Sequence, residues 1–328
     1  MNVRKKVLAV VLAVTAGPAA GCASLPTNSA PHVLRSFTPE ESEASAPRPV
    51  DGQEPDLLLR GFYAASARPD GNYEAARSYL TDAAASAWNP EEEKLVVDSI
   101  GMTTLPGSTV GKRSFAVHGK VVGTLRQGGV YTPERGTYEA TIELDMVDGQ
   151  WRISSLPAGV VMERTELRNQ YQPYNLYFFD DEDRELVTDR RWVHSARETL
   201  ASDLIALVME GPSERLRSAL TGVLPSSAAF TGVRDGAYTF TGFGGVPQDE
   251  RTRFAAQVVW TLATAGVTGP YRLTADGEPL IDGTDTLDTD DFVDVSPLVE
   301  SVGETMLYAL ADGKVVRVGD RSAQPVEG

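Results

Sequence analysis

The chain has few of the residues on which enzymes most often rely. Among its 328 residues are a single cysteine, Cys22, and three histidines. One thiol excludes an internal disulfide, and three histidines leave few candidates for general acid–base catalysis. The sequence also contains no P-loop, no dinucleotide-binding fingerprint and no G-x-S-x-G nucleophile motif. We therefore expect no catalytic residue, no cofactor and no metal site.

Positive charge is scarce as well. Lys and Arg number 30 against 46 Asp and Glu, which gives a formal net charge of −16. Loss of Arg4, Lys5 and Lys6 with an N-terminal signal would lower this charge to −19. Nucleic-acid binding needs Lys and Arg to neutralise phosphates, and adhesion to anionic lipid needs basic patches. The charge therefore argues against nucleic acid and against electrostatic attachment to a membrane.

The N-terminus has the three parts of a secretory signal peptide. A short basic segment precedes the uncharged apolar run at residues 7–14, and small residues follow that run. A membrane-spanning helix needs about 20 apolar residues, and this run is shorter. We therefore assign residues 1–21 to an export signal and not to a permanent membrane helix.

The signal ends at Ala19-Ala20-Gly21-Cys22, which resembles the lipobox of bacterial lipoproteins. The resemblance implies an S-diacylglycerol thioether on Cys22, cleavage before it, and N-acylation of the new amine, for example with palmitate. One departure is Ala19, because the lipobox usually has Leu there. The alternative is a free cysteine in an uncut tail. A lipidated Cys22 would hold the chain on the extracytoplasmic face of the cell membrane and would remove the one thiol from zinc binding.

A tether is expected between this cysteine and the folded part. Residues 22–50 are rich in Pro, Ser, Ala and Glu and show no helical or strand period. Such a composition predicts a disordered segment. About 280 residues follow it, which suggests two domains.

The first domain, residues 51–168, is expected to place helices before strands. Its predicted elements are a helix that begins at Pro55, a second helix over residues 72–88, and strands at 94–101, 114–126 and 136–157 with a hairpin turn at Asp148-Gly149. This order resembles the nuclear-transport-factor-like cone, in which a curved antiparallel sheet wraps against helices and often leaves a pocket. Phe62, Tyr63 and Trp88 are candidates to line such a pocket, and packing in the core is the alternative role for them.

The second domain, residues 169–281, is expected to alternate strands and helices. Its predicted elements are two strands within residues 174–193, a helix that starts at a Ser195/Glu198 capping box and ends at Gly211-Pro212, a hairpin around Asp235-Gly236, a helix over residues 248–266, and a final strand and turn. The fold class is therefore α+β for both domains.

Four segments of the second domain resemble the GerMN domain: "LYFFDDEDRELVTDRRWV", "LIALVMEGPSERLRSALTGVLP", "AAQVVWTLATAG" and "YRLTADGEPL". Two segments of the first domain, "LTDAAASAWNP" and "DGQWRISSLPAGVVMERTELRNQYQPYNLYF", extend the match. Together with the lipobox, they make the chain resemble the actinobacterial LpqB lipoprotein family. The resemblance implies association with the extracytoplasmic part of MtrB, the sensor kinase of a cell-envelope two-component system.

The C-terminal residues depart from that family. In it, the GerMN domain is followed by a β-propeller, whereas residues 282–328 here read as an acidic loop and one hairpin around Asp312-Gly313. One hairpin cannot close a multi-bladed propeller. Functions of the family that depend on the propeller are therefore not carried over.

Three other kinds of site were weighed. The acidic clusters Asp180–Asp183 and Asp282–Asp294 offer oxygen ligands for calcium, with solvated loops as the alternative. His118 with Asp98 or Asp145 would make an acid–base pair, with a structural histidine as the alternative. Paired carboxylates for glycoside hydrolysis fit the composition, but the sequence singles out no pair.

The sequence thus favours a non-enzymatic, lipid-anchored envelope lipoprotein that acts as an accessory or regulatory binding protein for an MtrB-type sensor kinase. The alternative is a lipoprotein that binds lipid or a cell-wall fragment in the cone of the first domain.

Overall fold

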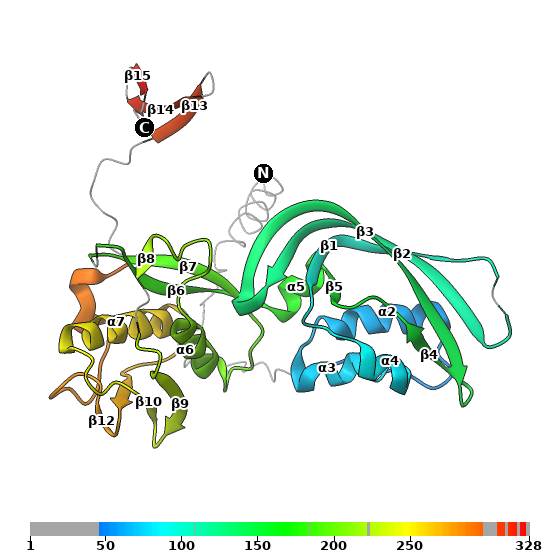
Figure 1. Ribbon diagram of the computed structural model, residues 1–328, viewed down its shortest axis with the longest axis horizontal. Helices are drawn as coiled ribbons and strands as arrows, with labels where there is room; N and C mark the ends of the chain where they lie inside the picture. Colours follow the sequence, from blue (N-terminus) through cyan, green and yellow to red (C-terminus); the bar gives the residue numbers. More distant parts are fainter. Residues whose placement is uncertain are drawn as a thin grey trace, which may run out of the picture. The chain divides into compact units, whose positions relative to one another are not determined.

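The computed structural model describes residues 46–107, 109–182, 184–221, 224–297, 307–311, 314–319 and 322–325. Within this part of the chain, two hydrophobic cores form, one from residues up to Tyr171 and one from Leu176 onward. Each core corresponds to one group of helices and strands (Figure 1). No helix of the described residues has the length and apolar character needed to cross a bilayer.

The first domain consists of a curled sheet with helices on its concave side (Figure 1). Its strands lie in the order β4-β3-β2-β1-β5. The elements are α2 Pro55–Ser66, α3 Asp70–Arg77, α4 Asp82–Ala87, β1 Lys94–Thr104, β2 Lys112–Arg126, η1 Gln127–Gly129, β3 Val130–Val147, β4 Gln150–Ser155, β5 Val160–Glu163 and α5 Arg164–Gln170.

Alternation along the strands explains the one-sided core of this sheet. In β2, Phe115, Val117 and Val121 are buried, while Lys112 and His118 face outward. Successive side chains of a strand point to opposite faces, so one apolar face meets the helices. The helix expected at Pro55 is confirmed, because α2 begins there and buries the apolar stripe that its spacing predicted.

Two predictions for this domain are wrong. The helix expected over residues 72–88 is divided into α3 and α4. Between them the backbone of Tyr79 and Thr81 bonds to Ile153 at 2.9 Å, and Thr81 starts a new helix by accepting the Ala84 N–H at 3.2 Å. The sheet is also not wholly antiparallel, because β5 pairs with β1 in parallel. A parallel partner returns through a crossover, and local alternation carries no signal for it.

The second domain has two small sheets with a helix between them. The strand orders are β7-β6-β8 and β12-β11-β10-β9. The elements are β6 Gln172–Asp180, β7 Leu186–Val193, α6 Leu200–Glu210, β8 Leu220–Thr221, β9 Ala229–Arg234, β10 Ala237–Thr241, α7 Gln248–Thr264, β11 Arg272–Ala275, β12 Glu278–Pro279 and η2 Thr289–Val295.

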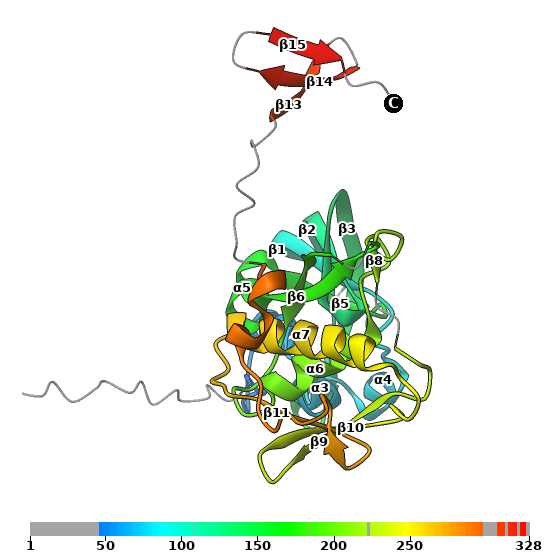
Figure 2. The ribbon, with the colours of Figure 1, turned by 90° about the vertical axis from the view of Figure 1, so that its left-hand side faces the viewer.

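Helix α7 is the centre of this domain. It lies between β6 and the sheet of β9–β11 (Figure 2), and every residue from Phe254 to Leu262 is buried. A helix that is apolar on all sides is stable only inside a core. Its one deeply buried hydroxyl, on Thr261, is satisfied because it accepts the Tyr177 N–H at 3.2 Å.

Asp-Gly pairs predicted the tight turns correctly. Asp148-Gly149 joins β3 to β4 with φ of 53° and 77°, and Asp235-Gly236 joins β9 to β10 with φ of 49° and 75°. Two successive positive φ angles are what a two-residue type I′ hairpin requires. The same pair at Asp276-Gly277 joins β11 to β12.

The helix before Gly211 begins later than predicted. Helix α6 starts at Leu200, and its preceding residue, Thr199, makes no side-chain cap. Ser195 instead donates to the Asp203 carboxylate at 2.6 Å, so the expected Ser195/Glu198 capping box is wrong. The helix end is confirmed, since Gly211 terminates α6 with a φ of 85°.

The C-terminal residues also differ from the expectation. Strands β13 Leu307–Ala311 and β14 Lys314–Gly319 pair antiparallel as predicted, the turn at Asp312-Gly313 lies outside the described residues, and a third strand, β15 Ser322–Pro325, pairs with β14. Part of the acidic loop is folded, because Asp288 and Asp291 form a capping box for η2 and Phe292 is buried. The segment is therefore a three-stranded sheet preceded by an ordered acidic turn.

The burial of the curled sheet yields a stability prediction. Leu144 in β3 is 0% exposed, whereas Val147 in the same strand is 42% exposed. We expect Leu144→Ala to lower the free energy of unfolding by about 2–5 kcal/mol, because it leaves a cavity in the core. Val147→Ala is the control and should change it by less than about 0.5 kcal/mol. Urea unfolding measures both, and equal losses would contradict the described packing.

Candidate functional site

The predicted lipidation residue, Cys22, lies outside the described residues, and its modification stays a prediction. The proposed acid–base pair does not assemble. Asp98 forms an ion pair with Arg164 at 3.0 Å, and Asp145 forms one with Lys112 at 3.2 Å. His118 lies opposite Gly101 and Glu139 in the sheet. His118 therefore forms no acid–base pair with Asp98 or Asp145 in this structure.

The interior of the first domain is filled by side chains. Phe62, Tyr63 and Trp88 are all buried, and Phe62 packs edge-on against Trp88 with ring centroids 5.5 Å apart. Trp88 also donates its indole N–H to the Gly159 carbonyl at 2.9 Å. Desolvation by burial raises the pKa of the Tyr63 phenol well above its usual value. These aromatic residues are thus core residues, and Phe62 and Tyr63 border only the two hollows described next.

The two hollows that Phe62 or Tyr63 borders are small. One of about 150 Å³ lies beside Arg60 and Glu163, and another of about 10 Å³ lies beside Ser66 and Leu156. Ligand pockets usually hold about 300–1,000 Å³. Neither hollow has the size of a lipid or wall-fragment site.

The acidic clusters are used to build turns. The Asp180 carboxylate accepts the backbone N–H of Arg184 at 2.7 Å and of Glu185 at 3.2 Å, and these bonds lower its pKa. The Asp288 carboxylate accepts the Asp290 N–H at 2.8 Å in the second cluster. Among the described residues, no group of three or more His, Cys, Asp or Glu is placed to hold a metal ion.

The most prominent site starts from a buried ion pair in β7. Asp189 and Arg191 are two residues apart, so they point to the same face of the strand. Their side chains are 5% and 3% exposed. Arg191 donates Nε and Nη2 to one Asp189 oxygen at 3.1 and 2.7 Å. Paired charges are the form in which ions are tolerated inside proteins.

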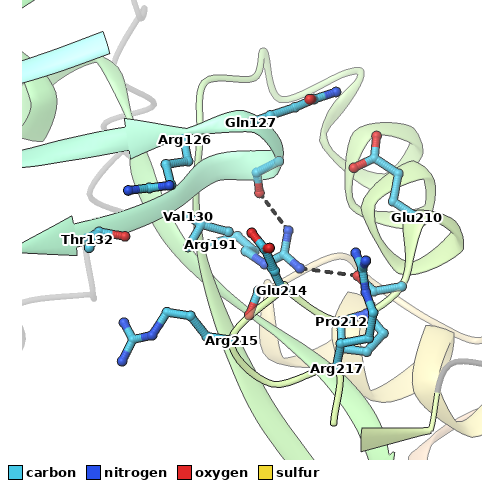
Figure 3. Close-up of a pocket in the computed structure, with 13 residues that line it drawn as sticks. Arg126, Gln127, Val130, Thr132, Arg191, Glu210, Pro212, Glu214, Arg215 and Arg217 are labelled. Atoms are coloured by element: carbon cyan, nitrogen blue, oxygen red, sulfur yellow. Dashed lines mark hydrogen bonds between the residues drawn. The ribbon is translucent and has the colours of Figure 1, made fainter. Parts of the chain in front are cut away.

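The same pair connects the first domain to the second. Arg191 donates Nη1 to the Gly128 carbonyl at 2.8 Å and Nη2 to the Gly211 carbonyl at 3.2 Å (Figure 3). Asp189 accepts the Ser213 N–H at 2.7 Å. One guanidinium therefore holds together the turn after β2, strand β7 and the loop after α6.

Two glycines allow this close approach. Gly128 and Gly129 have φ of 69° and 77°, which favour glycine. A β-carbon on Gly128 would lie 2.8 Å from the Arg191 guanidinium, and one on Gly129 would collide with the Trp192 carbonyl oxygen. The turn can therefore reach β7 only because both residues lack a side chain.

A second set of contacts reinforces the junction. His194 bonds through Nδ1 to the Gln170 carbonyl at 2.7 Å, and its Nε2 lies 3.0 Å from the Asp70 carboxylate at the start of α3. Tyr131 in β3 packs against Trp192 in β7 with ring centroids 6.3 Å apart. Polar and aromatic contacts at separate points thus resist rotation of one domain against the other.

A groove of about 670 Å³ opens beside the ion pair. Thirteen residues line it (Figure 3), and four of them are arginines: Arg126, Arg191, Arg215 and Arg217. Glu210 and Glu214 are its two acidic lining residues. Arg191 is neutralised by Asp189, so the exposed charges are three arginines and two glutamates. This is a polar site whose wall is richer in arginine than the acidic chain as a whole.

Sequence reasoning missed this site. A usable signal was present in β7, "LVTDRRWV", where alternation places Asp189, Arg191 and Val193 on one face. Two charged residues on the same face as buried apolar ones indicate an internal ion pair. The opposite wall of the groove contains Arg126 and Gln127, which lie some sixty residues earlier than β7. A local sequence pattern cannot show that these distant segments come together.

The ion pair generates a prediction. We expect Arg191→Met to lower the free energy of unfolding by about 3–5 kcal/mol, because Asp189 is left buried and unpaired. Arg190→Met is the matched control, since Arg190 is the exposed neighbour in the same strand, and it should cost less than about 0.5 kcal/mol.

A double variant separates charge from packing. Asp189→Leu combined with Arg191→Met removes both charges and should recover much of the stability lost in Arg191→Met. Chemical unfolding of the chain from Ala46 onward measures all four proteins. Equal effects of the changes at Arg190 and Arg191 would contradict the role of the pair.

Two family models match separate parts of the chain. A family model described as the N-terminal domain of lipoprotein LpqB matches residues 48–168, and one described as sporulation and spore germination matches residues 175–281. Two solved structures from Bacillus subtilis, the tandem GerMN domains of the sporulation protein GerM and the first of these domains, show 17% and 22% identity with TM-scores of 0.30 and 0.29. Each covers 37% of this chain, and the match covers 47% and 99% of those chains.

Several similar proteins carry the name lipoprotein LpqB. That of Corynebacterium diphtheriae is 41% identical over 335 residues, and the match covers 100% of this chain and 57% of the relative. Those of Rhodococcus jostii and Mycobacterium bovis are 36% and 31% identical, with 98% and 94% of this chain and 56% and 55% of the relatives covered. The chain thus spans little more than half the length of these relatives. With an LpqB N-terminal domain followed by a GerMN domain, the chain belongs to the LpqB family of lipoproteins.

Proposed function

We propose that this chain is a lipid-anchored accessory protein of the cell envelope that binds and modulates an MtrB-type sensor kinase. In this proposal Cys22 carries the lipid, and the two domains stand on the extracytoplasmic side of the membrane. The kinase is suggested by the family to which the chain belongs. The chain itself contributes a surface for binding, and no step of chemistry is assigned to it.

The junction between the domains is the observation that carries the proposal. Arg191 joins a turn of the first domain to a loop of the second, and the groove lies against the same residues. A partner that contacts both walls therefore meets one preformed surface. Preformed surfaces bind with less loss of conformational freedom than surfaces that must be ordered on contact.

The lining of the groove favours binding over catalysis. Its polar groups are arginines, two glutamates, a glutamine and the hydroxyls of Thr132 and Ser213, and none of the thirteen is a histidine, cysteine or lysine. A nucleophile needs an adjacent base to be activated. Charged, exposed side chains of both signs are instead common where proteins recognise one another.

The alternative, capture of a lipid or wall fragment in the first domain, has less support. Its candidate residues Phe62, Tyr63 and Trp88 are packed together, and the hollows around them are small. A ligand of that kind would need an apolar cavity several times larger. We therefore do not favour this function.

The anchor is tested by Cys22→Ala. One acyl chain binds a membrane only marginally, whereas two or three chains on one residue give stable attachment. We expect the variant to leave the membrane fraction and to lose incorporation of labelled palmitate, with wild type as the control. Membrane retention together with undiminished label would show that Cys22 is not the attachment point.

Binding is tested with the chain from Ala46 onward, which contains both hydrophobic cores. We expect it to bind the purified extracytoplasmic domain of the kinase with a dissociation constant of tens of micromolar or tighter, measured by biolayer interferometry. An unrelated extracytoplasmic domain is the control. Absence of binding over this concentration range would refute the proposed function.

A further inference from the structure

We propose that the groove between the domains binds a short peptide segment of the partner through carboxylates on that segment, which Arg126, Arg215 and Arg217 recognise. This inference rests on the proposed function, since the segment is assigned to the kinase's extracytoplasmic domain. It adds to the proposed function a binding location, the chemistry of the bound segment, and the residues that recognise that segment.

The arginines come from both walls of the groove. Arg126 ends β2 in the first domain, while Arg215 and Arg217 lie in the turns after α6 in the second. In Figure 3, Arg126 and Arg215 extend toward the same side of the groove from opposite elements. A ligand placed between them would touch both domains at once.

The chemistry of these side chains points to carboxylates. A guanidinium presents donors in a planar fork that matches both oxygens of a carboxylate. All three arginines are exposed, so the partner does not have to displace a buried group to reach them. Arg126 has a nearby acid, Glu134 at 3.4 Å, but this pair is itself exposed and exchanges with a competing carboxylate at little cost.

The two glutamates of the groove favour a peptide over a simple anion. Glu210 and Glu214 are exposed on the same lining and offer acceptors for backbone N–H groups or for a basic side chain. An inorganic phosphate or a polyanion brings no positive charge to balance them. A peptide has both N–H donors and carboxylates, and a groove of about 670 Å³ has the size of a typical ligand site.

The charge of the rest of the chain limits how acidic the partner can be. With a net charge of −16 the protein repels extended acidic surfaces. The groove therefore suits a segment in which a few carboxylates are grouped, on a partner that is otherwise neutral or basic. Electrostatic complementarity of this kind sets specificity more than raw affinity.

The position of the groove is fixed by the ion pair below it. Gly128, which follows Arg126 by two residues, is bonded to Arg191, and Gly211 and Ser213 on the other wall bond to the same pair. The backbone positions from which the arginines extend are thereby set before the ligand arrives. Fixed attachment points reduce the conformational freedom that is lost when the arginines hold one segment.

The test compares charge reversals in the chain from Ala46 onward. We expect Arg215→Glu to weaken binding of the kinase domain by about tenfold or more, because one charged hydrogen bond is lost and a repulsion is added. Arg217→Glu should act similarly. Arg234→Glu at the end of β9 is the matched control, because it changes an exposed arginine outside the groove by the same charge, and it should change affinity by less than about twofold.

Peptides identify the ligand itself. Overlapping peptides that cover the kinase domain are titrated into the chain. Each is used with its natural sequence and with every Asp and Glu replaced by Asn and Gln. We expect one segment to bind wild type and to lose binding on replacement or with Arg215→Glu. The milder change Arg126→Gln should weaken the same peptide, and thermal unfolding checks that each variant is folded.

Each failure has a separate meaning. If the kinase domain binds wild type and both charge reversals equally, the groove inference is overturned while the proposed function stands. If the kinase domain does not bind the chain, but an acidic peptide binds it through Arg215, the proposed kinase partner is wrong. The assignment of the bound segment to that kinase is then also wrong. Stronger binding of inorganic phosphate than of any peptide would also overturn the inference.

Discussion

The buried ion pair between Asp189 and Arg191 is the constraint on which the relation between the two domains depends. Taking two charges out of water costs several kcal/mol per ion. The chain offsets this cost because Arg191 also donates to Gly128 and Gly211, and Asp189 accepts from Ser213. An apolar pair would avoid the desolvation cost, but it would leave the Gly128 and Gly211 carbonyls and the Ser213 N–H without these partners. The pair therefore determines which turn meets which loop.

The other features of the junction follow from that pair. Gly128 and Gly129 are needed because the turn comes so close to β7 that a side chain on either would collide with Arg191 or Trp192. The position of this turn also determines where Arg126 lies. Arg126 lines one wall of the groove, and the loop that carries Arg215 lines the other. The backbone geometry of this turn and the position of Arg126 are thus tied to one buried guanidinium, while the contacts of His194 and Trp192 add to the junction independently.

Sequence predicted the parts of the fold that depend on neighbouring residues. Asp148-Gly149 and Asp235-Gly236 form the predicted turns because a two-residue hairpin demands positive φ at both positions, whatever surrounds it. Parallel pairing of β5 with β1 and the hydrogen bond from Arg191 to the Gly128 carbonyl depend on contacts between residues far apart in sequence, and these were missed. The proposed lipid on Cys22 is a third kind of property, because it is predicted from a processing signal and not from the fold.

The acidic character of the chain limits which partners the groove can bind. At long range the net charge of −16 repels any acidic partner. At the groove, three arginines attract acidic groups. Screening shortens electrostatic reach to about 8 Å at physiological ionic strength, so the two effects act at different distances. A uniformly acidic surface is repelled before the groove can contribute, whereas a neutral or basic surface with one grouped set of carboxylates approaches freely. Attachment to a membrane would further confine the protein to partners in the same layer, and a modest local attraction is then sufficient for selection.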